Sequence, residues 1–183
     1  MTIKRTLILL ALSIISAVLT CGFLLETIEQ KDFEQKIFEL GDNSKSPSSL
    51  QMYNLIEKKS KEFDIPKYIL YNVAWLETRY CGPFDWSYNP YRTSGAGAQG
   101  PMQIITRFAH YYAGRTVTAK ELRTDLELNI TISCSMLSKL YKRYGRWDIA
   151  LGYYNTGYPQ VNDYASYGFN NKDYKVKWIE PDF

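Results

Sequence analysis

The first feature of the hydrophobic pattern is an apolar run near the N-terminus. Residues 6–25 contain no charged side chain, and as a helix they would be about 30 Å long, close to the thickness of a membrane's hydrocarbon core. Lys4 and Arg5 precede the run, and positive charge of this kind stays on the cytoplasmic side. The pattern predicts an uncleaved inner-membrane anchor, with the rest of the chain in the periplasm or outside the membrane. A cleaved signal peptide and a lipoprotein modified at Cys21 are the alternatives.

The segment after this run is acidic and helical in pattern. Residues 26–40, ETIEQKDFEQKIFEL, repeat apolar positions at helical spacing among many charges, and they predict a stalk that continues the anchor helix. Residues 41–49, GDNSKSPSS, are rich in Gly, Pro, Asn and Ser, which favour a linker. We therefore expect an anchor over 1–25, a stalk and linker over 26–49, a folded domain over 50–166 and a C-terminal tail over 167–183.

Apolar positions recur every three or four residues along most of the predicted domain, which is the spacing of an amphipathic helix. Helices are predicted over residues 50–63, 64–80, 125–145, 147–155 and 159–167. Between the second and third of these, residues 84–101 are rich in Gly and Pro and predict an extended loop or a small irregular sheet. The pattern as a whole predicts a mainly α fold.

The helix over 64–80 has recognisable start and stop signals. Asp64 is expected to cap its N-terminus with Pro66 in the first turn, and Gly82 and Pro83 are expected to end it. After the glycine-rich stretch, a further helix is expected to begin near Met102.

Charge and cysteine content argue against two classes of function. The formal net charge is +3, and from Ser48 onward 17 Lys and Arg side chains are scattered among 13 Asp and Glu. This is not the concentrated basic surface of a nucleic-acid-binding protein, although it suits weak attraction to an anionic polymer. A single His and three Cys without a CxxC pair make a zinc site unexpected. Cys81 and Cys134 either form a disulfide or are separate buried thiols.

One acid lies within the apolar pattern of the second predicted helix. Glu77, in WLETRY, neighbours the stripe formed by Val73, Leu76 and Tyr80, so packing of the stripe draws its carboxyl toward the core or a groove. Desolvation and the partial negative charge at the end of the helix both raise the pKa of such a carboxyl. A carboxylic acid that is partly protonated near neutral pH can act as a general acid. The alternative is a structural Glu that pairs with Arg79 or reaches solvent.

Three motifs, in this order along the chain, resemble those of the lytic transglycosylase (SLT) domain of the lysozyme-like superfamily, over roughly residues 50–166. ETRY has Glu77 at the family's catalytic acid, NPYRTSGAGAQGPMQ has its Asn-Pro, Ser, Gly-Ala, Gly and Met-Gln, and GYYNTG has its Tyr-Asn. Thr78, Pro101 and Tyr153 depart from the Ser, Leu and Ala that are usual in the family. The resemblance implies a lysozyme-like domain in which the Tyr154 hydroxyl holds the Glu77 carboxyl. It also implies substrate contacts from Thr78, Ser94, Gly97, Ala98, Met102, Gln103 and Asn155.

The resemblance further implies a substrate and a product. Ordinary glycosidases use two carboxyl groups about 5–9.5 Å apart, but Asp85 is the only other acid between Glu77 and Gln103. In the family, the N-acetyl oxygen and the 6-hydroxyl of N-acetylmuramic acid (MurNAc) in peptidoglycan glycan strands replace the second carboxyl. The reaction gives 1,6-anhydroMurNAc ends and needs no cofactor or metal. The alternatives are a goose-type muramidase, in which Asp85 or another acid directs water, and a catalytically silent wall-binding or scaffold component of an envelope-spanning or phage apparatus.

Overall fold

The computed structural model describes residues 2–41 and 45–172, except for the side chains of residues 2–19 and 21. The chain forms two units, Met1–Glu39 and Leu40–Phe183. The first unit consists of a single long helix, and the second contains all the sequence motifs of the predicted site.

Helix α1 (Thr2–Gly41) includes the whole of the predicted stalk. Its exposed side chains are bridged along the helix, with Lys36 Nζ 2.7 Å from Asp32 Oδ2 in an i,i+4 ion pair. The predicted membrane span, residues 6–25, lies mostly outside the side chains that are described, so it stays a prediction. Within the described part of the chain, no helix is both long and apolar enough to cross a membrane.

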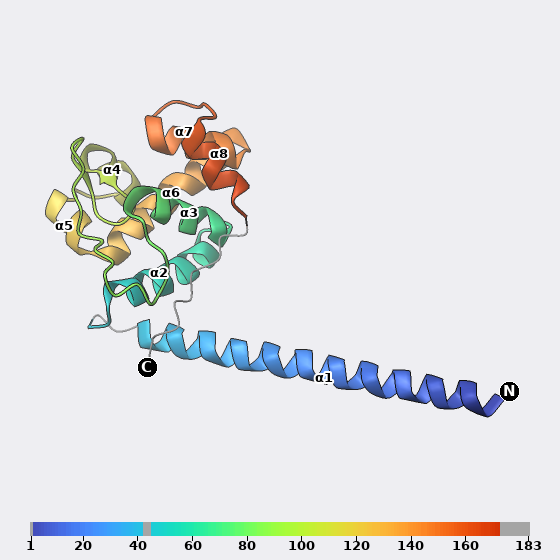
Figure 1. Ribbon diagram of the computed structural model, residues 1–183. Coiled ribbons are helices and arrows are strands. Elements are labelled where there is room, and N and C mark those ends of the chain that lie inside the picture. Colours follow the sequence, from blue (N-terminus) through green and yellow to red (C-terminus); the bar gives the residue numbers. More distant parts are fainter. Residues whose placement is uncertain (1, 42–44, 173–183) are drawn as a thin grey trace. The chain divides into compact units, whose positions relative to one another are not determined.

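The second unit is a helical domain with one small sheet, as the pattern predicts. Helix α6 runs through its middle and packs against α2, α4, α5 and α7, while α7 packs on α8 and α8 on α3 (Figure 1). The elements after α1 are α2 (Ser48–Glu62), α3 (Lys67–Thr78), β1 (Ala98–Gln99), β2 (Ile104–Ile105), α4 (Thr106–Ala113), α5 (Ala119–Thr124), α6 (Leu126–Tyr144), α7 (Trp147–Thr156) and α8 (Asp163–Asn170).

The start of α3 differs from the prediction because Asp64 belongs to the end of α2. Asp64 has a left-handed φ of 53°, and the following Ile65 N–H donates to the Ser60 carbonyl at 2.9 Å, which closes the last turn of α2. Pro66 occupies the N-cap position of α3, where no side chain caps the helix. The prediction that Asp64 caps α3 is therefore wrong.

The end of α3 also comes earlier than Gly82. Thr78 is its last residue, because Arg79 adopts the left-handed conformation with φ 63° and its N–H donates to the Trp75 carbonyl. Glu77 is therefore in the last turn of the helix, where the chain leaves the core.

The end of the glycine-rich stretch forms one strand of a small antiparallel sheet. Of the two predicted alternatives, an extended loop and a small irregular sheet, the sheet is therefore confirmed. Ala98 pairs with Ile105 and Gln99 pairs with Ile104. The helix expected near Met102 begins later, at Thr106, so that prediction is wrong. Gln103 has a left-handed φ of 49°, which a right-handed helix cannot contain, and the two residues after it belong to β2.

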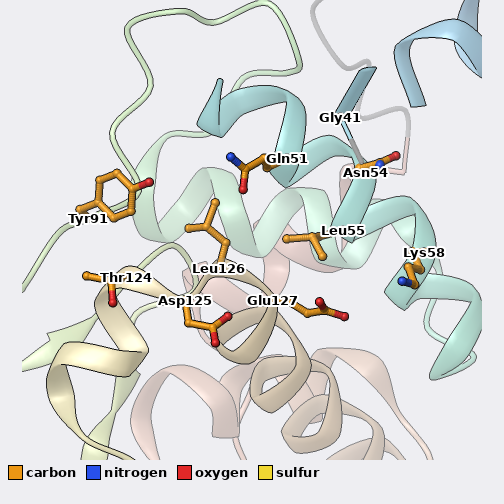
Figure 2. A pocket seen from close by; sticks show the side chains of 10 residues that line it. All are labelled: Gly41, Gln51, Asn54, Leu55, Lys58, Tyr91, Thr124, Asp125, Leu126 and Glu127. Carbon is orange, nitrogen blue, oxygen red and sulfur yellow. The ribbon is translucent and has the colours of Figure 1, made fainter. Parts of the chain in front are cut away.

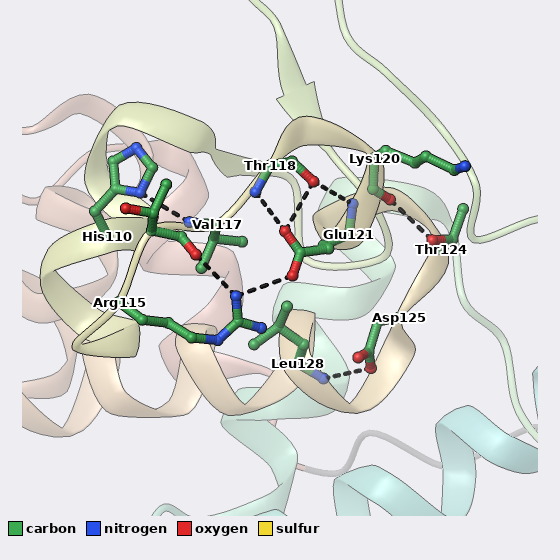
Figure 3. Close-up of polar contacts among 10 residues, drawn as sticks. His110, Arg115, Val117, Thr118, Lys120, Glu121, Thr124, Asp125 and Leu128 are labelled. Atoms are coloured by element: carbon green, nitrogen blue, oxygen red, sulfur yellow. Dashed lines mark hydrogen bonds and ion pairs between the residues drawn. The ribbon is translucent and has the colours of Figure 1, made fainter.

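Helix α5 was not predicted, although a capping box marks its start. Thr118 Oγ1 accepts from the Glu121 N–H at 3.1 Å, and Glu121 Oε2 accepts from the Thr118 N–H at 2.7 Å (Figure 3). The hydrogen bond from the Thr118 backbone, then that from its hydroxyl and that from Arg115, lower the pKa of Glu121 to about 2. Just before this helix, the Val117 N–H donates to His110 Nδ1 at 3.0 Å and ties it to α4.

Helix α6 carries much of the core. Its predicted stripe is buried at Ile130, Cys134 and Leu137, and Gly145 ends the helix with a left-handed φ of 66°. Burial raises the pKa of the Cys134 thiol to about 12. Cys134 is a free thiol, so the structure does not contain the disulfide to Cys81 that was one of the two alternatives.

The connection from α7 to α8 brings the last helix against α3. A Cβ at Gly152 would lie 1.6 Å from the Gln160 carbonyl oxygen, so only glycine allows the returning loop to pack directly on α7. Asn162 then caps α8 by accepting from the Ala165 N–H at 2.9 Å. Asn72 Nδ2, on α3, donates to the Gly168 carbonyl at 3.0 Å. These contacts fix α8 beside the helix that carries Glu77.

Candidate active site

A cavity of about 440 Å³ lies where α3, the β1–β2 region, α4, α6 and α7 meet. It brings together side chains from all three sequence motifs. Of the predicted site residues, Glu77, Ser94, Ala98, Gln103, Tyr154 and Asn155 line it. Its other lining residues are Ala96, Ile104, Ile105, Arg107, Phe108, Tyr112, Met136, Tyr153, Thr156 and Gly157.

Glu77 is the one carboxyl among the described residues that line this cavity. Its pKa is raised from 4.5 to about 7, because burial removes water from the charged form. A hydrogen bond from the Tyr164 hydroxyl to Oε1, 2.7 Å long, opposes this rise without cancelling it. The predicted rise in pKa from desolvation is confirmed, while the predicted contribution of the helix end stays a prediction. Near neutral pH this carboxyl is present in both protonation states.

The tyrosine that holds Glu77 is not the predicted one. The Tyr154 hydroxyl donates to the Met102 carbonyl at 2.7 Å and lies 3.0 Å from Ser133 Oγ. Because its proton is used in that bond, Tyr154 cannot donate it to Glu77, and Tyr164 on α8 takes this role. Tyr154 instead ties α7 to the chain before β2 and contributes to the cavity wall.

The glycine-rich loop forms a tight turn beside the cavity. The Gly97 N–H donates to the Ser94 carbonyl, and the Ala98 N–H donates to Ser94 Oγ at 3.1 Å. Gly97 has a φ of 80°, which glycine adopts without strain, but it is not among the lining residues. Its amide is used within the turn, so Ser94 and Ala98 are the members of this loop that face the cavity.

Gln103 and Asn155 line the cavity and are held by hydrogen bonds from nearby residues. Gln103 Nε2 donates to the Gly100 carbonyl at 2.8 Å, which leaves the amide oxygen for a ligand. Asn155 Oδ1 accepts from Asn162 Nδ2 at 3.1 Å, so this side chain also fixes the loop that leads into α8. Both residues line the cavity, and their contact with a substrate stays a prediction.

Thr78 and Met102 are buried behind the cavity rather than in its wall. The Thr78 hydroxyl lies 2.9 Å from the Pro101 carbonyl oxygen and 2.9 Å from the Tyr88 hydroxyl. Met102 is fully buried, and its N–H donates to Asn129 Oδ1 at 3.0 Å. Neither residue is among those that line the cavity, and both fix the chain that carries Gln103.

Asp85, the other acid near the motifs, is not among the residues that line the cavity. Its Oδ1 accepts from the hydroxyl of Ser87 at 2.6 Å and from the Ser87 N–H at 3.2 Å. It therefore stabilises a turn in the loop after α3.

A family model supplies the observation that decides the identity of this domain. The model of the transglycosylase SLT domain matches residues 54–177, more than half of the chain. The chain belongs to the transglycosylase SLT-domain family. The helical fold with its two-stranded sheet is consistent with the lysozyme-like fold of this family, and membership supports a peptidoglycan-degrading function of the lytic transglycosylase type. No curated protein matches the chain.

The candidate site of this SLT domain also contains residues that motif reading missed. Tyr164 lies within the matched range but on α8, far along the chain from Glu77, and nothing in the local pattern distinguishes it from the neighbouring tyrosines. Arg107, Phe108 and Tyr112 line the cavity from α4. The sequence feature that could have identified them is the run TRFAHYY, in which three aromatic residues lie on a short helix without an acid.

A second cavity of the SLT domain, of about 500 Å³, lies between α2 and the N-terminal end of α6 (Figure 2). Within the described residues, Asn54 Oδ1 is buried there without a hydrogen-bond partner. None of the predicted site residues lines it, and Glu77 lines only the first cavity of the two.

Proposed function

We propose that this protein is a lytic transglycosylase that cleaves the bond between MurNAc and N-acetylglucosamine with Glu77 as its single acid/base. The observation that carries the proposal is the state of Glu77, which lines the cavity as its one described carboxyl and has a pKa of about 7. A group with this pKa can give up a proton and take one back at neutral pH.

Glu77 serves both steps of the proposed reaction. It donates its proton to the glycosidic oxygen while the N-acetyl oxygen of MurNAc attacks the anomeric carbon, which breaks the glycosidic bond. The Glu77 carboxylate then accepts the proton of the 6-hydroxyl, whose oxygen displaces the N-acetyl oxygen and closes the 1,6-anhydro ring. Because Tyr164 donates to Oε1, Oε2 is the oxygen that carries the transferred proton.

Peptidoglycan contacts are assigned to the polar groups that remain open in the cavity. Gln103 has an amide oxygen for an N-acetyl N–H, and Ser94 and Asn155 offer groups for sugar hydroxyls. The aromatic side chains of Tyr112 and Tyr153 supply apolar faces for the sugar rings.

Product analysis is the experiment that tests the proposal. The full-length protein in mild detergent is incubated with purified peptidoglycan, and the soluble products are examined by mass spectrometry. We expect the newly formed MurNAc ends to be lighter than reducing ends by one water, because the 6-hydroxyl replaces water as the nucleophile. Reducing ends would mean hydrolysis and support the goose-type muramidase. The absence of any soluble product would support the silent wall-binding alternative.

Substitution of Tyr164 tests the assignment of the acid through the pH profile. For the unchanged protein, kcat/KM should fall above about pH 7, where Glu77 loses its proton. Tyr164→Phe removes a hydrogen bond that lowers the pKa of Glu77, so the alkaline limb should move upward by about one to two pH units. Tyr154→Phe is the matched control, because its hydroxyl bonds Met102 and not Glu77. If the limb stays in place in Tyr164→Phe, or moves equally in both variants, Glu77 is not the group that sets it.

We also propose that residues 6–25 anchor the enzyme in the inner membrane, with the SLT domain in the periplasm or outside the membrane. The support is the charge-free run of twenty residues after Lys4 and Arg5. The intact mass of the protein purified from membranes distinguishes this anchor from a cleaved leader or a lipid-modified Cys21.

A further inference from the structure

A line of cationic side chains leads away from the Glu77 cavity along α6. Met136 lines the cavity, and Lys139 and Arg143 follow it at intervals of three and four residues, which places all three on one side of the helix. Both cations are exposed to solvent. Helices α4 and α7, which contribute Tyr112 and Tyr153 to the same cavity, both pack against α6.

Tyrosine rings, rather than carboxylates, hold these two cations in place. Lys139 Nζ lies 4.5 Å from the centre of the Tyr111 ring and 5.1 Å from that of Tyr112, and the two rings meet edge to face at 4.9 Å. The guanidinium of Arg143 lies 5.5 Å from the Tyr144 ring. Burial raises the pKa of Tyr112, and the charge of Arg143 opposes that rise, so Tyr112 lies close enough to Arg143 to feel its charge. We call Lys139, Arg143 and these tyrosines the cationic ridge.

The cationic ridge has no acid of its own to neutralise it. Residues 86–118 and 128–147 contain no Asp or Glu, and within the described residues neither Lys139 nor Arg143 forms an ion pair. Some cations elsewhere in the domain form ion pairs with nearby acids. Lys59, for example, contacts both Glu62 and Glu127. The positive charge beside the cavity is thus available to an anion from outside.

We propose that the cationic ridge binds the carboxylates of peptide stems carried by the glycan strand in the cavity, so that the enzyme prefers strands that bear stems. This inference rests on the proposed function for its substrate. In a strand that bears stems, the lactyl carboxyl of each MurNAc is joined to the stem as an amide, so the free carboxylates of the strand are those of the peptides. The exposed Tyr111 ring, with 72% of its surface accessible, offers the adjacent stem an apolar contact.

Binding of two strand types tests this preference without any cleavage. The full-length protein carrying Glu77→Gln is titrated against fluorescent glycan strands with intact stems and against the same strands after an amidase has removed the stems, which leaves one lactyl carboxylate on each MurNAc. We expect about three- to tenfold tighter binding of stem-bearing strands at low salt, the size expected of two exposed ionic contacts. The preference should shrink as added salt screens the charges.

Two double variants in the Glu77→Gln background assign the preference to the ridge. Lys139→Gln with Arg143→Gln should reduce binding of stem-bearing strands to the level of stripped strands and leave binding of stripped strands unchanged. Lys61→Gln with Lys120→Gln removes the same charge from α2 and α5, which do not line the cavity, and should keep the preference. Equal affinity of the parent for both strand types, or an equal loss on both in the ridge variant, would overturn the proposal. The Glu77→Gln protein could show the stem preference while the unchanged protein cleaves neither strand type. That result would support the ridge and reject the proposed reaction.

Discussion

Replacement of Glu77 by Gln should reduce the rate of peptidoglycan cleavage at least about a thousandfold. This lies within the range of general acid–base catalysis, and Glu77 transfers a proton in both steps of the proposed reaction. Gln fills nearly the same space, and its amide oxygen can still accept the hydrogen bond from Tyr164. It cannot donate a proton to the leaving oxygen or accept one from the 6-hydroxyl. The rate of release of soluble fragments from purified cell walls measures the effect.

Asp85→Asn is the matched control for this loss. Asp85 is the acid that the muramidase alternative needs, yet it bonds Ser87 and does not line the cavity. We expect the variant to keep its rate within about threefold, because Asp85 lies outside the cavity and the Asn oxygen can still accept the hydrogen bonds from Ser87. A large loss in Asp85→Asn would favour a second carboxyl in the reaction. Equal rates for Glu77→Gln and the unchanged protein would rule out Glu77 as the acid.

The sequence was most informative where a local rule and the tertiary structure agree. The stripe of α6, its glycine stop at Gly145 and the small sheet after α3 all follow from periodicity and from glycine. Around Met102 the local rule failed, because Asn129 from α6 bonds the Met102 N–H and Gln103 takes a left-handed conformation. The periodicity of residues 102–105 gives no sign of either contact.

The candidate site shows the same limit in its two tyrosines. The motif around Tyr154 is local and was found, but the role assigned to it depends on which hydroxyl reaches Glu77 in space. That contact comes from Tyr164, and it exists only because the loop packed on Gly152 returns α8 to α3. Similarly, Thr78 belongs to a motif, and only the structure shows that it supports the site from behind. A sequence motif therefore identified the neighbourhood of the site, while packing decided which atoms meet in it.

The stability of the fold should depend on pH through Glu77, with the opposite sign to that of an ordinary paired carboxylate. Its pKa is about 7 in the folded protein and ordinarily 4.5, so between these values the folded state binds more protons than the unfolded state. The free energy of unfolding therefore falls as pH rises through this range, by about 3 kcal/mol in all at 1.36 kcal/mol per pKa unit. Gln does not titrate, so Glu77→Gln should not share this decrease.

We accordingly expect Glu77→Gln to gain about 2–3 kcal/mol of stability relative to the unchanged protein when the pH is raised from about 5 to about 8. Guanidinium unfolding of both full-length proteins, followed by near-ultraviolet circular dichroism at several pH values, gives the difference directly, because all other groups titrate in both. A flat difference for Glu77→Gln would mean that the carboxyl is not desolvated in the folded protein. If the stability of Glu77→Gln relative to the unchanged protein rises with pH, burial of the Glu77 carboxyl lowers the stability of the fold at neutral pH. The same burial is what keeps this acid partly protonated there.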